Sequence, residues 1–457
     1  MVSFTGHRFF IAAMTATLKK RTIFFIKESV TVKISTLSRA CAMLSASLIL
    51  AACSSSHQGL SSQVAPGTAS LPVLSADEAA NFTTKNYLAF GGPSLQVQQQ
   101  GWFPKLASTD GVNTHFVVGP QLGTDGAEYS NVQMAVNAAL AVRNHGERIF
   151  IKILPGTYNG AVYIPAGSPP VTLFGAGNSS ADVTLAQGLE AAAAPATYRS
   201  TVSPNGQFLP GDRAFYMFQN CATLTTETIG TGCTATVWSQ SNGVQIQNLT
   251  IGNSLLDTVD GGDHSAVALR TDGDNVILDN VRLIGRQNTF MVNTANIHNQ
   301  TDNSRYSRAY VHNSLIVGDV DYVFGRANAV FDHVEFHTVS SRGVKQASVF
   351  APNTPAAAPY GFLVIDSNLT GDRGFEQAAK AKMGRAWDAD GASSQLVIRD
   401  SSFDNSYDQM NPWGASVFSG QPFAGNVPKD EKQQRNLNDT NFNRLWQYNN
   451  VLTQPAK

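Results

Sequence analysis

A short pattern in which apolar residues flank a polar pair recurs six times in the second half of the chain. With one polar residue of each copy taken as a marker, the steps between successive copies are 32, 33, 20, 34 and 33 residues. The markers are Asn248, Asn280, Asn313, His333, Ser367 and Asp400. A repeat of this length is typical of a solenoid, in which each unit packs only on its neighbours.

The residues inside each copy indicate strands rather than helices. β-Branched and aromatic residues alternate with polar ones, and Gly, Asn and Asp fill the gaps. We therefore predict an all-β parallel β-helix, with strands of adjacent coils about 4.8 Å apart around a continuous core. The alternative is a set of chance strand patterns in a β-sandwich or an α/β barrel. A barrel needs a helix after every strand, and the chain offers few helical stretches.

The clearest helical segment begins at Ser130, where Ser130 and Gln133 form a capping-box pattern. Its apolar stripe consists of Val132, Val136, Ala139, Leu140 and Val142 or their neighbours. A solenoid needs an element to cover its first coil, so we predict an N-terminal capping helix here.

The composition allows one large domain. The chain has 457 residues, of which 42% are hydrophobic and 14% are charged, and its net charge is −1. This charge gives no reason to expect nucleic acid as a partner. We assign the β-helix domain to residues 111–457 and expect a monomer.

An apolar run that ends at Cys53 is typical of a secretory signal, because it is too short to span a bilayer. The run 50–53 reads Leu-Ala-Ala-Cys, which is similar to the bacterial lipobox, whose cysteine is acylated and becomes the mature N-terminus. We predict a signal peptide over residues 1–52, then a lipidated tether and N-terminal extension over 53–110. An ordinary secretory signal with an incidental cysteine is the alternative.

Several acyl chains on one cysteine would hold the protein firmly to a membrane. Ser54 follows Cys53, where many lipoproteins retained at the inner membrane carry aspartate. We therefore expect a lipid anchor in the bacterial outer membrane, facing the periplasm or the cell surface.

The cysteines outside the signal and the lipobox are Cys221 and Cys233, separated by a Thr- and Gly-rich loop. In an oxidising compartment we expect them to form a disulfide. A metal site would need more ligands than this stretch offers, and the chain has no Gly-rich phosphate-binding motif. We expect neither a metal nor a cofactor.

Three further runs carry the chemistry: Gln287-Asn288-Thr289, residues 319–325 and residues 384–387. Asn288 lies 8 residues after the marker Asn280, and Asp321 lies 8 residues after the marker Asn313. The two side chains are therefore predicted at one phase of adjacent coils, close enough to act on one bond.

A carboxylate attacks an ester carbonyl only if it is ionised and aimed, and the leaving group needs a proton donor. Asp321 would be the nucleophile, and Arg385 would keep it ionised and orient it by a paired hydrogen bond. Gln287 could offer its amide N–H to the oxyanion. A wall for a sugar ring or an acyl chain could come from Trp387, Tyr322 or Phe290.

Each of these runs has a plain structural interpretation. Asp319 and Asp321 could be turn residues, and Arg385 could be a solvent-facing cation in a loop. The joint occurrence of three runs at positions that fit the coils favours the functional interpretation.

The chain resembles the pectin methylesterases, or pectinesterases, a carbohydrate esterase family. The resemblance covers most of the chain and rests on residues 116–118, 125–126, 149–158, 173–177, 266–269, 285–289, 318–325 and 384–387. It implies a right-handed, single-stranded parallel β-helix of the pectin lyase-like type. It also implies that Asp321 is the nucleophile, Gln287 an oxyanion donor, Arg385 the carboxylate partner and Trp387 a ring that contacts the substrate.

Two positions depart from the family pattern. Asn288 stands where the family has a second aspartate, its general acid and base. Ser265 stands where the family has a glutamine that donates to the oxyanion. Asparagine cannot deliver a proton, and loss of general acid–base help costs roughly 10² to 10⁴-fold in rate.

A branch of the family found as enterobacterial outer-membrane lipoproteins, described provisionally as acyl-CoA thioester hydrolases, is a closer match. The residues that carry this match are 285–290, 263–264 and 435–441. A thiolate leaves more easily than an alkoxide, so a thioester would tolerate the missing acid. The objection is location, because acyl-CoA is cytosolic.

The sequence thus predicts an outer-membrane-anchored, pectinesterase-like hydrolase that acts on a polysaccharide ester, an acyl ester or a thioester. Two alternatives stay open: a non-catalytic saccharide-binding envelope lipoprotein with a degenerate esterase site, and a purely structural envelope protein. His264 is a candidate to replace the missing acid, because histidine carries protons near neutral pH.

Overall fold

The computed structural model describes residues 67–68, 70–114, 116–142, 146–422 and 435–453. The predicted signal peptide, the lipidation site Cys53 and the first part of the tether lie outside the described residues. No helix among the described residues is long and apolar enough to cross a membrane.

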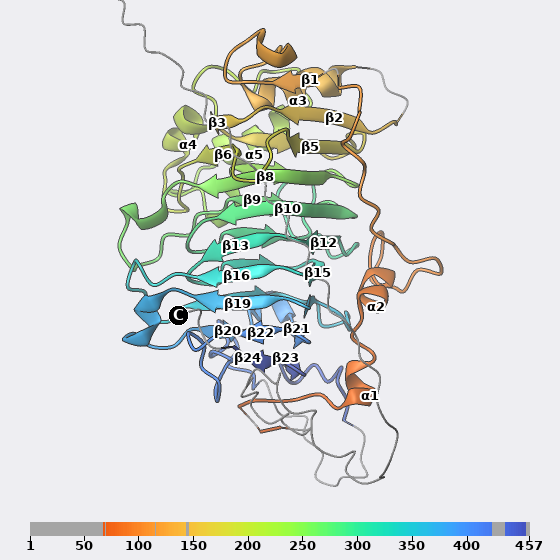
Figure 1. Ribbon diagram of the computed structural model, residues 1–457, viewed down its shortest axis with the longest axis vertical. Helices are drawn as coiled ribbons and strands as arrows, with labels where there is room; N and C mark the ends of the chain where they lie inside the picture. The colour runs from red at the N-terminus through yellow and green to blue at the C-terminus, as the bar shows by residue number, and fades with distance from the viewer. Residues whose placement is uncertain (1–66, 69, 115, 143–145, 423–434, 454–457) are drawn as a thin grey trace, which may run out of the picture. The chain divides into compact units, whose positions relative to one another are not determined.

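The described chain winds into a parallel β-helix whose wall has three strips of strands (Figure 1), and every pairing between its strands is parallel. The prediction of a parallel β-helix is confirmed. Strips one and two belong to a 17-stranded sheet, and strip three is a 7-stranded sheet.

The strips have the following strands. Strip one holds β1 (Phe116–Val118), β2 (Ile149–Ile153), β5 (Val171–Gly175), the first halves of β8 (Gln245–Asn253) and β10 (Val276–Ile284), β12 (Arg308–His312), β15 (Asn328–Asp332), β18 (Phe362–Ile365), β21 (Gln395–Arg399) and β23 (Arg444–Tyr448). Strip two holds β3 (Gly156–Asn159), β6 (Val183–Gln187), the second halves of β8 and β10, β13 (Leu315–Gly318), β16 (Glu335–Thr338), β19 (Asn368–Gly371), β22 (Ser402–Phe403) and β24 (Val451–Leu452). Strip three holds β4 (Val162–Ile164), β7 (Val237–Ser239), β9 (Leu269–Thr271), β11 (Phe290–Val292), β14 (Val323–Gly325), β17 (Ser348–Pro352) and β20 (Lys382–Gly384).

Strips one and two meet at a column of residues with left-handed backbone conformation. Asparagine and aspartate tolerate this conformation better than other side chains, which explains why the repeat is visible in the sequence. The column consists of Asn248, Asn280, Asn313, His333, Asp366, Asp400 and Asn449, with φ between 47° and 55°. The marker Ser367 is therefore wrong by one residue, and Asn449 is a further member. Ser367 instead belongs to the next position, where its hydroxyl accepts the Val334 N–H.

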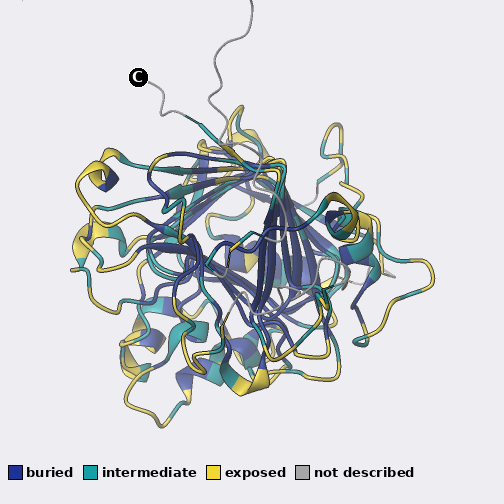
Figure 2. Cartoon of the chain, turned by 90° about the horizontal axis from the view of Figure 1, so that it is seen from below, coloured by how far each residue is buried: buried dark blue, intermediate teal, exposed yellow. Residues whose placement is uncertain are grey.

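The core fills the coil with aliphatic and aromatic side chains from all three strips. Seen from below in Figure 2, the buried strands form the wall and the exposed segments lie in the loops around it. Helix α3 (Val132–Ala141) packs on β1, β2 and β4 and covers the first coils, as predicted. Its N-cap is Asn131 rather than Ser130, because the Asn131 side chain accepts the Met134 N–H at 3.1 Å. Gln133 is buried instead, and it bonds the main chain of Tyr163.

The described part of the predicted N-terminal extension packs along strip one. It contains α1 (Ala76–Ala79) and α2 (Thr84–Ala89), which lie at the right edge of Figure 1. Side-chain amides on the strip bond its main chain: Asn328 Nδ2 donates to the carbonyls of Tyr87 and Phe90, and Gln245 Nε2 donates to that of Lys105. These bonds lie on β8 and β15, the first and last of four successive coils, and fasten the segment to the wall.

The connection between β6 and β7 is a lobe that covers the outer face of strip three. The lobe contains α4 (Pro195–Val202), α5 (Phe215–Ala222) and the short helix η2 (Thr231–Cys233). Cys221 and Cys233 form a disulfide inside it, so that prediction is confirmed. The remaining short helices are η1 (Thr124–Gly126), η3 (Leu256–Thr258), η4 (Arg373–Glu376) and η5 (Ala389–Gly391).

Candidate active site

Asn288 and Asp321 occupy the same position on adjacent coils, as predicted. Each lies two residues before a pair of aligned strand residues, Phe290 in β11 and Val323 in β14. The Asn288 N–H donates to the Val320 carbonyl at 3.0 Å. Both residues have a left-handed backbone, with φ of 64° and 45°. The two side chains therefore leave the wall at the same bend of successive coils.

The Asp321 carboxylate is held on both oxygens. Arg385 Nη2 donates to Oδ2 at 2.6 Å, and Arg385 Nε lies 2.9 Å from Oδ1 and 3.0 Å from Oδ2. Ser348, one coil further on, donates its hydroxyl to Oδ1 at 2.6 Å. The hydrogen bonds to Asp321 raise the pKa of the Arg385 guanidinium above its ordinary value. The carboxylate is thus fixed in direction and paired with a permanent cation.

Asp319 has a different role from Asp321. Its carboxylate is buried and receives Arg342 Nε at 2.7 Å and Arg342 Nη2 at 3.1 Å. Arg342 also donates Nη1 to the carbonyl of Asp260 at 3.0 Å. This buried ion pair therefore ties the Asp321 segment to the loop that precedes β9.

Gln287 faces that loop and its amide has a defined orientation. Its Oε1 accepts the His264 N–H at 3.0 Å, and its Nε2 donates to Asp263 Oδ1 at 2.7 Å. The Ser265 hydroxyl accepts the other Gln287 N–H at 3.3 Å and donates to Asn288 Oδ1 at 2.8 Å. Asn288 Nδ2 in turn donates to the Asp321 carbonyl at 3.2 Å. The structure therefore brings Gln287, Ser265, Asn288 and Asp321 together.

His264 does not direct its ring at these residues. Its Nδ1 lies 2.6 Å from Glu190 Oε2 and its Nε2 lies 3.1 Å from Asp260 Oδ1. The hydrogen bond to Glu190, assisted by Asp260, raises the pKa of His264. Both ring nitrogens are thus occupied by carboxylates. His264 as a replacement for the missing acid is therefore wrong, and it positions Gln287 through its main chain.

The predicted ring wall needs a correction. Phe290 and Tyr322 are fully buried and belong to the core inside the coil, so neither side chain can contact a substrate. Trp387 is partly exposed on the outer face and packs against Phe324, with ring centroids 5.9 Å apart. Met291 lies in the same outer cluster. Trp387 remains the candidate for ring contact, with Phe324 behind it.

Ser348, Asp263 and Arg342 were not predicted as site residues from the sequence. Ser348 is visible only through the strand register, because it pairs with Lys382 of β20 and lies two residues before Phe350, the partner of Val323. Asp263 and Arg342 lie in loops without a repeat. Spacing alone gives no signal for such residues.

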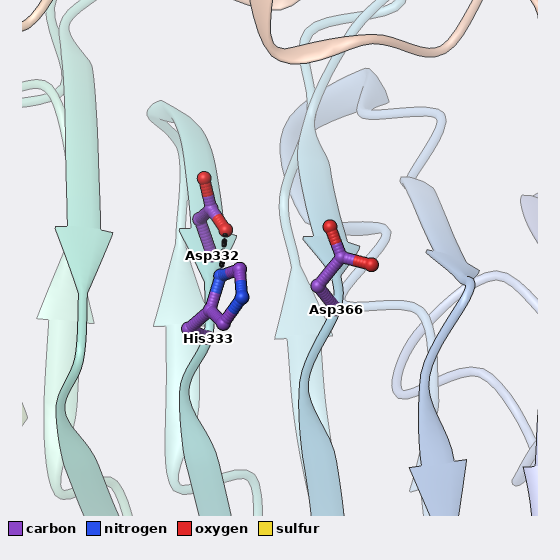
Figure 3. A group of neighbouring side chains, drawn as sticks. All are labelled: Asp332, His333 and Asp366. Carbon is purple, nitrogen blue, oxygen red and sulfur yellow. Dashed lines mark hydrogen bonds and ion pairs between the residues drawn. The ribbon is translucent and has the colours of Figure 1, made fainter.

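Within the described ranges, one group of side chains has the spacing of metal ligands: Asp332, His333 and Asp366, whose ligand atoms lie within 4.8 Å of one another. Figure 3 shows them on two neighbouring coils, where strips one and two meet. This is the turn column of the larger sheet, whereas Asp321 lies at strip three. Exposed acidic groups alone do not define a metal centre, and we assign none.

The site combines a carboxylate aligned by a guanidinium with amide N–H groups beside it on the face of a parallel β-helix. This arrangement is typical of a hydrolase that attacks an acyl carbon. Comparison with known proteins agrees. The pectinesterase family model matches residues 218–422. Pectinesterase B of Dickeya dadantii (strain 3937) is 52% identical over 420 residues, which cover 89% of this chain and 96% of the relative.

Two solved structures share the fold. The Escherichia coli YbhC structure has a TM-score of 0.79 and 42% identity, and the alignment covers 86% of this chain and 97% of that one. The rice weevil pectin methylesterase has a TM-score of 0.73 and 35% identity, with 86% and 99% covered. The Escherichia coli (strain K12) relative is named "Putative acyl-CoA thioester hydrolase YbhC" and is 44% identical over 421 residues, which cover 90% of this chain and 96% of the relative. The chain belongs to the pectinesterase family. It is a right-handed parallel β-helix hydrolase that acts on esters.

Proposed function

We propose that this protein removes methyl esters from a pectic polysaccharide, with Asp321 as the nucleophile. The observation that carries the proposal is the Asp321 carboxylate, which Arg385 and Ser348 hold on both oxygens. This pairing fixes the orientation of the carboxylate and leaves it with one direction of attack. The 52% identity to Pectinesterase B supports a polysaccharide ester as the substrate.

The reaction would proceed through an acyl-enzyme. Asp321 attacks the ester carbonyl carbon, and the oxygen of that carbonyl becomes an oxyanion. The Gln287 N–H that makes the longer contact, 3.3 Å to the Ser265 hydroxyl, would donate to the oxyanion in place of that hydroxyl, while His264 and Asp263 keep the amide oriented. Departure of the alkoxide leaves an anhydride on Asp321, which water then hydrolyses to regenerate the carboxylate.

Asn288 would act as a hydrogen-bond donor in this reaction and not as an acid. Its Oδ1 accepts from Ser265 and one Nδ2 hydrogen goes to the Asp321 carbonyl, so its other hydrogen can reach the reacting centre. An amide donor stabilises developing charge but transfers no proton.

A thioester is the second candidate substrate. Asn288 favours it, because a thiolate leaves without a proton from the enzyme, and the name of YbhC describes such an activity for that relative. A saccharide-binding protein without turnover would be the outcome if neither bond is cleaved.

The test measures methanol release from methylated pectin beside hydrolysis of a short-chain thioester. The variants are wild type, Asp321→Ala and Asn288→Asp. Methanol release by wild type that disappears in Asp321→Ala is the expected result. Equal rates in wild type and Asp321→Ala would refute the proposal. Turnover that appears only in Asn288→Asp would identify a binding protein with a disabled site.

We also propose that Cys53 carries a lipid anchor that places the protein in the bacterial outer membrane. The lipobox-like run before Cys53 supports this. Expression in a lipoprotein-processing bacterium, with wild type compared with Cys53→Ala, tests it. Wild type should partition with the outer membrane and incorporate labelled fatty acid, whereas the variant should not. Incorporation that persists in the variant would refute the assignment.

A further inference from the structure

A methyl ester needs two proton transfers that the groups around Asp321 do not supply. The alkoxide must gain a proton as it leaves, and the attacking water must lose one. Asn288, Gln287 and Ser265 have amides or a hydroxyl that do not titrate in the useful range, and Arg385 stays protonated. The reaction therefore needs another carboxyl group or imidazole within reach.

Asp263 is the carboxyl group that meets this need. Among the described residues, it is the one titratable side chain besides Asp321 and Arg385 that bonds the side chain of Gln287, Asn288 or Asp321. Its Oδ1 lies 2.7 Å from Gln287 Nε2 and 3.3 Å from Ser265 Oγ. Ser265 Oγ links it to Asn288 by two contacts, 3.3 Å to Asp263 Oδ1 and 2.8 Å to Asn288 Oδ1, and Asn288 occupies the coil position aligned with Asp321.

The Asp263 carboxyl is also accessible from solvent. The residue is exposed, and its Oδ2 has no hydrogen-bond partner within the described ranges. The Gln287 amide it contacts is the group that would face the oxyanion. A general acid or base must reach the leaving or attacking oxygen by a hydrogen bond, directly or through one water, and Asp263 lies beside the amide that would bind the oxyanion of the same carbon.

The loop that contains Asp263 is held in place by contacts on both sides of that residue. Arg342, which is paired with the buried Asp319, holds the Asp260 carbonyl at 3.0 Å. A side chain at Gly261 would collide with the Arg342 carbonyl, since a Cβ there would lie 2.7 Å from that oxygen. After Asp263, the His264 N–H bonds Gln287 Oε1 at 3.0 Å. The position of Asp263 is therefore set by the fold and not by chance contact.

We propose that Asp263 is the general acid and general base of this esterase, an inference that rests on the proposed function. In its protonated form it gives its proton to the methoxide as the bond from carbon to that oxygen breaks, which releases methanol and leaves the anhydride on Asp321. The Asp263 carboxylate then takes a proton from water as the hydroxide adds to the anhydride carbonyl. Asp321 leaves as carboxylate, the product is the free acid, and Asp263 is protonated again.

The alternative is that Asp263 only positions Gln287. The two roles differ in how they depend on the leaving group. An acid matters for methoxide, which leaves poorly without a proton, and matters little for an aryloxide, which leaves as an anion. Loss of a correctly held oxyanion donor slows both substrates alike.

The test compares methylated pectin with an aryl ester in wild type, Asp263→Asn and Asp321→Ala. Asparagine keeps an oxygen that accepts from Gln287 Nε2, so it removes the proton and keeps the hydrogen bond. We expect methanol release by Asp263→Asn to fall roughly 10² to 10⁴-fold, with aryl ester hydrolysis nearly unchanged. Asp390→Asn is the matched control, because Asp390 is an exposed aspartate three residues after Trp387 that, within the described ranges, makes no hydrogen bond to the site residues, and both its rates should equal wild type.

A second variant tests relocation of the carboxyl group. Asp263→Asn combined with Asn288→Asp should regain methanol release, because a carboxyl group then stands beside Asp321 on the adjacent coil. Equal losses on both substrates in Asp263→Asn, or no loss, would overturn the role of Asp263 while leaving Asp321 as the nucleophile. If Asp321→Ala keeps wild-type rates, or wild type cleaves neither substrate, the proposed function fails and this inference fails with it.

Discussion

Ser348 Oγ lies 2.6 Å from Asp321 Oδ1 and also accepts the Asp321 N–H at 3.1 Å, so one hydroxyl fixes both the main chain and the carboxylate of the nucleophile. Ser348 is buried in β17, one coil away from Asp321. The orientation of the Asp321 carboxylate therefore depends on how these two coils stack.

Ser348→Ala should lower kcat/KM about 10- to 100-fold, since a hydrogen bond to a charged group contributes about 1.5–3 kcal/mol. Methanol release from methylated pectin measures the effect. Ser314→Ala is the control, because Ser314 also accepts a main-chain N–H from a neighbouring coil, that of Val281, but lies at the turn column. Equal rate losses in both variants would mean that the effect is structural.

Trp387→Ala should raise KM about 3- to 10-fold with little change in stability, because a stacking ring contributes about 0.5–1.5 kcal/mol. Phe290→Ala should instead lower the free energy of unfolding by about 3–5 kcal/mol, because it leaves a cavity inside the coil. Steady-state kinetics and urea denaturation separate the two effects. Little loss of unfolding free energy in Phe290→Ala would contradict its burial.

The stability of the protein should depend on pH through His264. Hydrogen bonds to Glu190 and Asp260 raise its folded-state pKa above the unfolded value of about 6.5. A raised pKa contributes stability that is complete below about pH 6.5 and is lost as pH rises through the folded-state pKa. The groups that face the ring are Glu190 and Asp260.

His264→Gln should therefore remove part of the decline in stability above about pH 6.5. Urea denaturation of wild type and variant between about pH 5 and pH 9 measures this difference. Parallel curves for the two proteins over the whole range would show that the carboxylates around His264 do not stabilise its charged form.

Removal of the disulfide should destabilise the lobe over strip three. The bond joins Cys221 to Cys233 across a separation of 12 residues. The variant with both cysteines changed to serine should lose about 2–3 kcal/mol of unfolding free energy. Wild type in reductant should match the variant in denaturation experiments. A variant as stable as oxidised wild type would contradict the expectation.

Much of the fold could be predicted from the sequence, because the bends of the coil depend on the backbone preferences of single residues. The bend between strips one and two requires a left-handed residue, and Asn, Asp and His at 248, 280, 313, 333 and 400 meet this requirement by their own conformational preferences. The same repeat predicted that Asn288 and Asp321 occupy the same position on adjacent coils. The error at Ser367 came from choosing the second of two adjacent polar residues, although the preference of aspartate for the left-handed conformation favours Asp366.

The sequence by itself determined the coil repeat, the disulfide pair and the positions of Asp321, Gln287 and Arg385, because these follow from local backbone preference, cysteine count and short motifs. Only the tertiary structure decided that Phe290 and Tyr322 face the core while Met291 and Phe324 face outward, and that Ser348 and Asp263 reach the site. The physical reason is that the direction of a side chain depends on where each coil bends. The loops that carry Asp263 and separate the coils have no constant length, so contacts between coils follow from stacking and not from spacing.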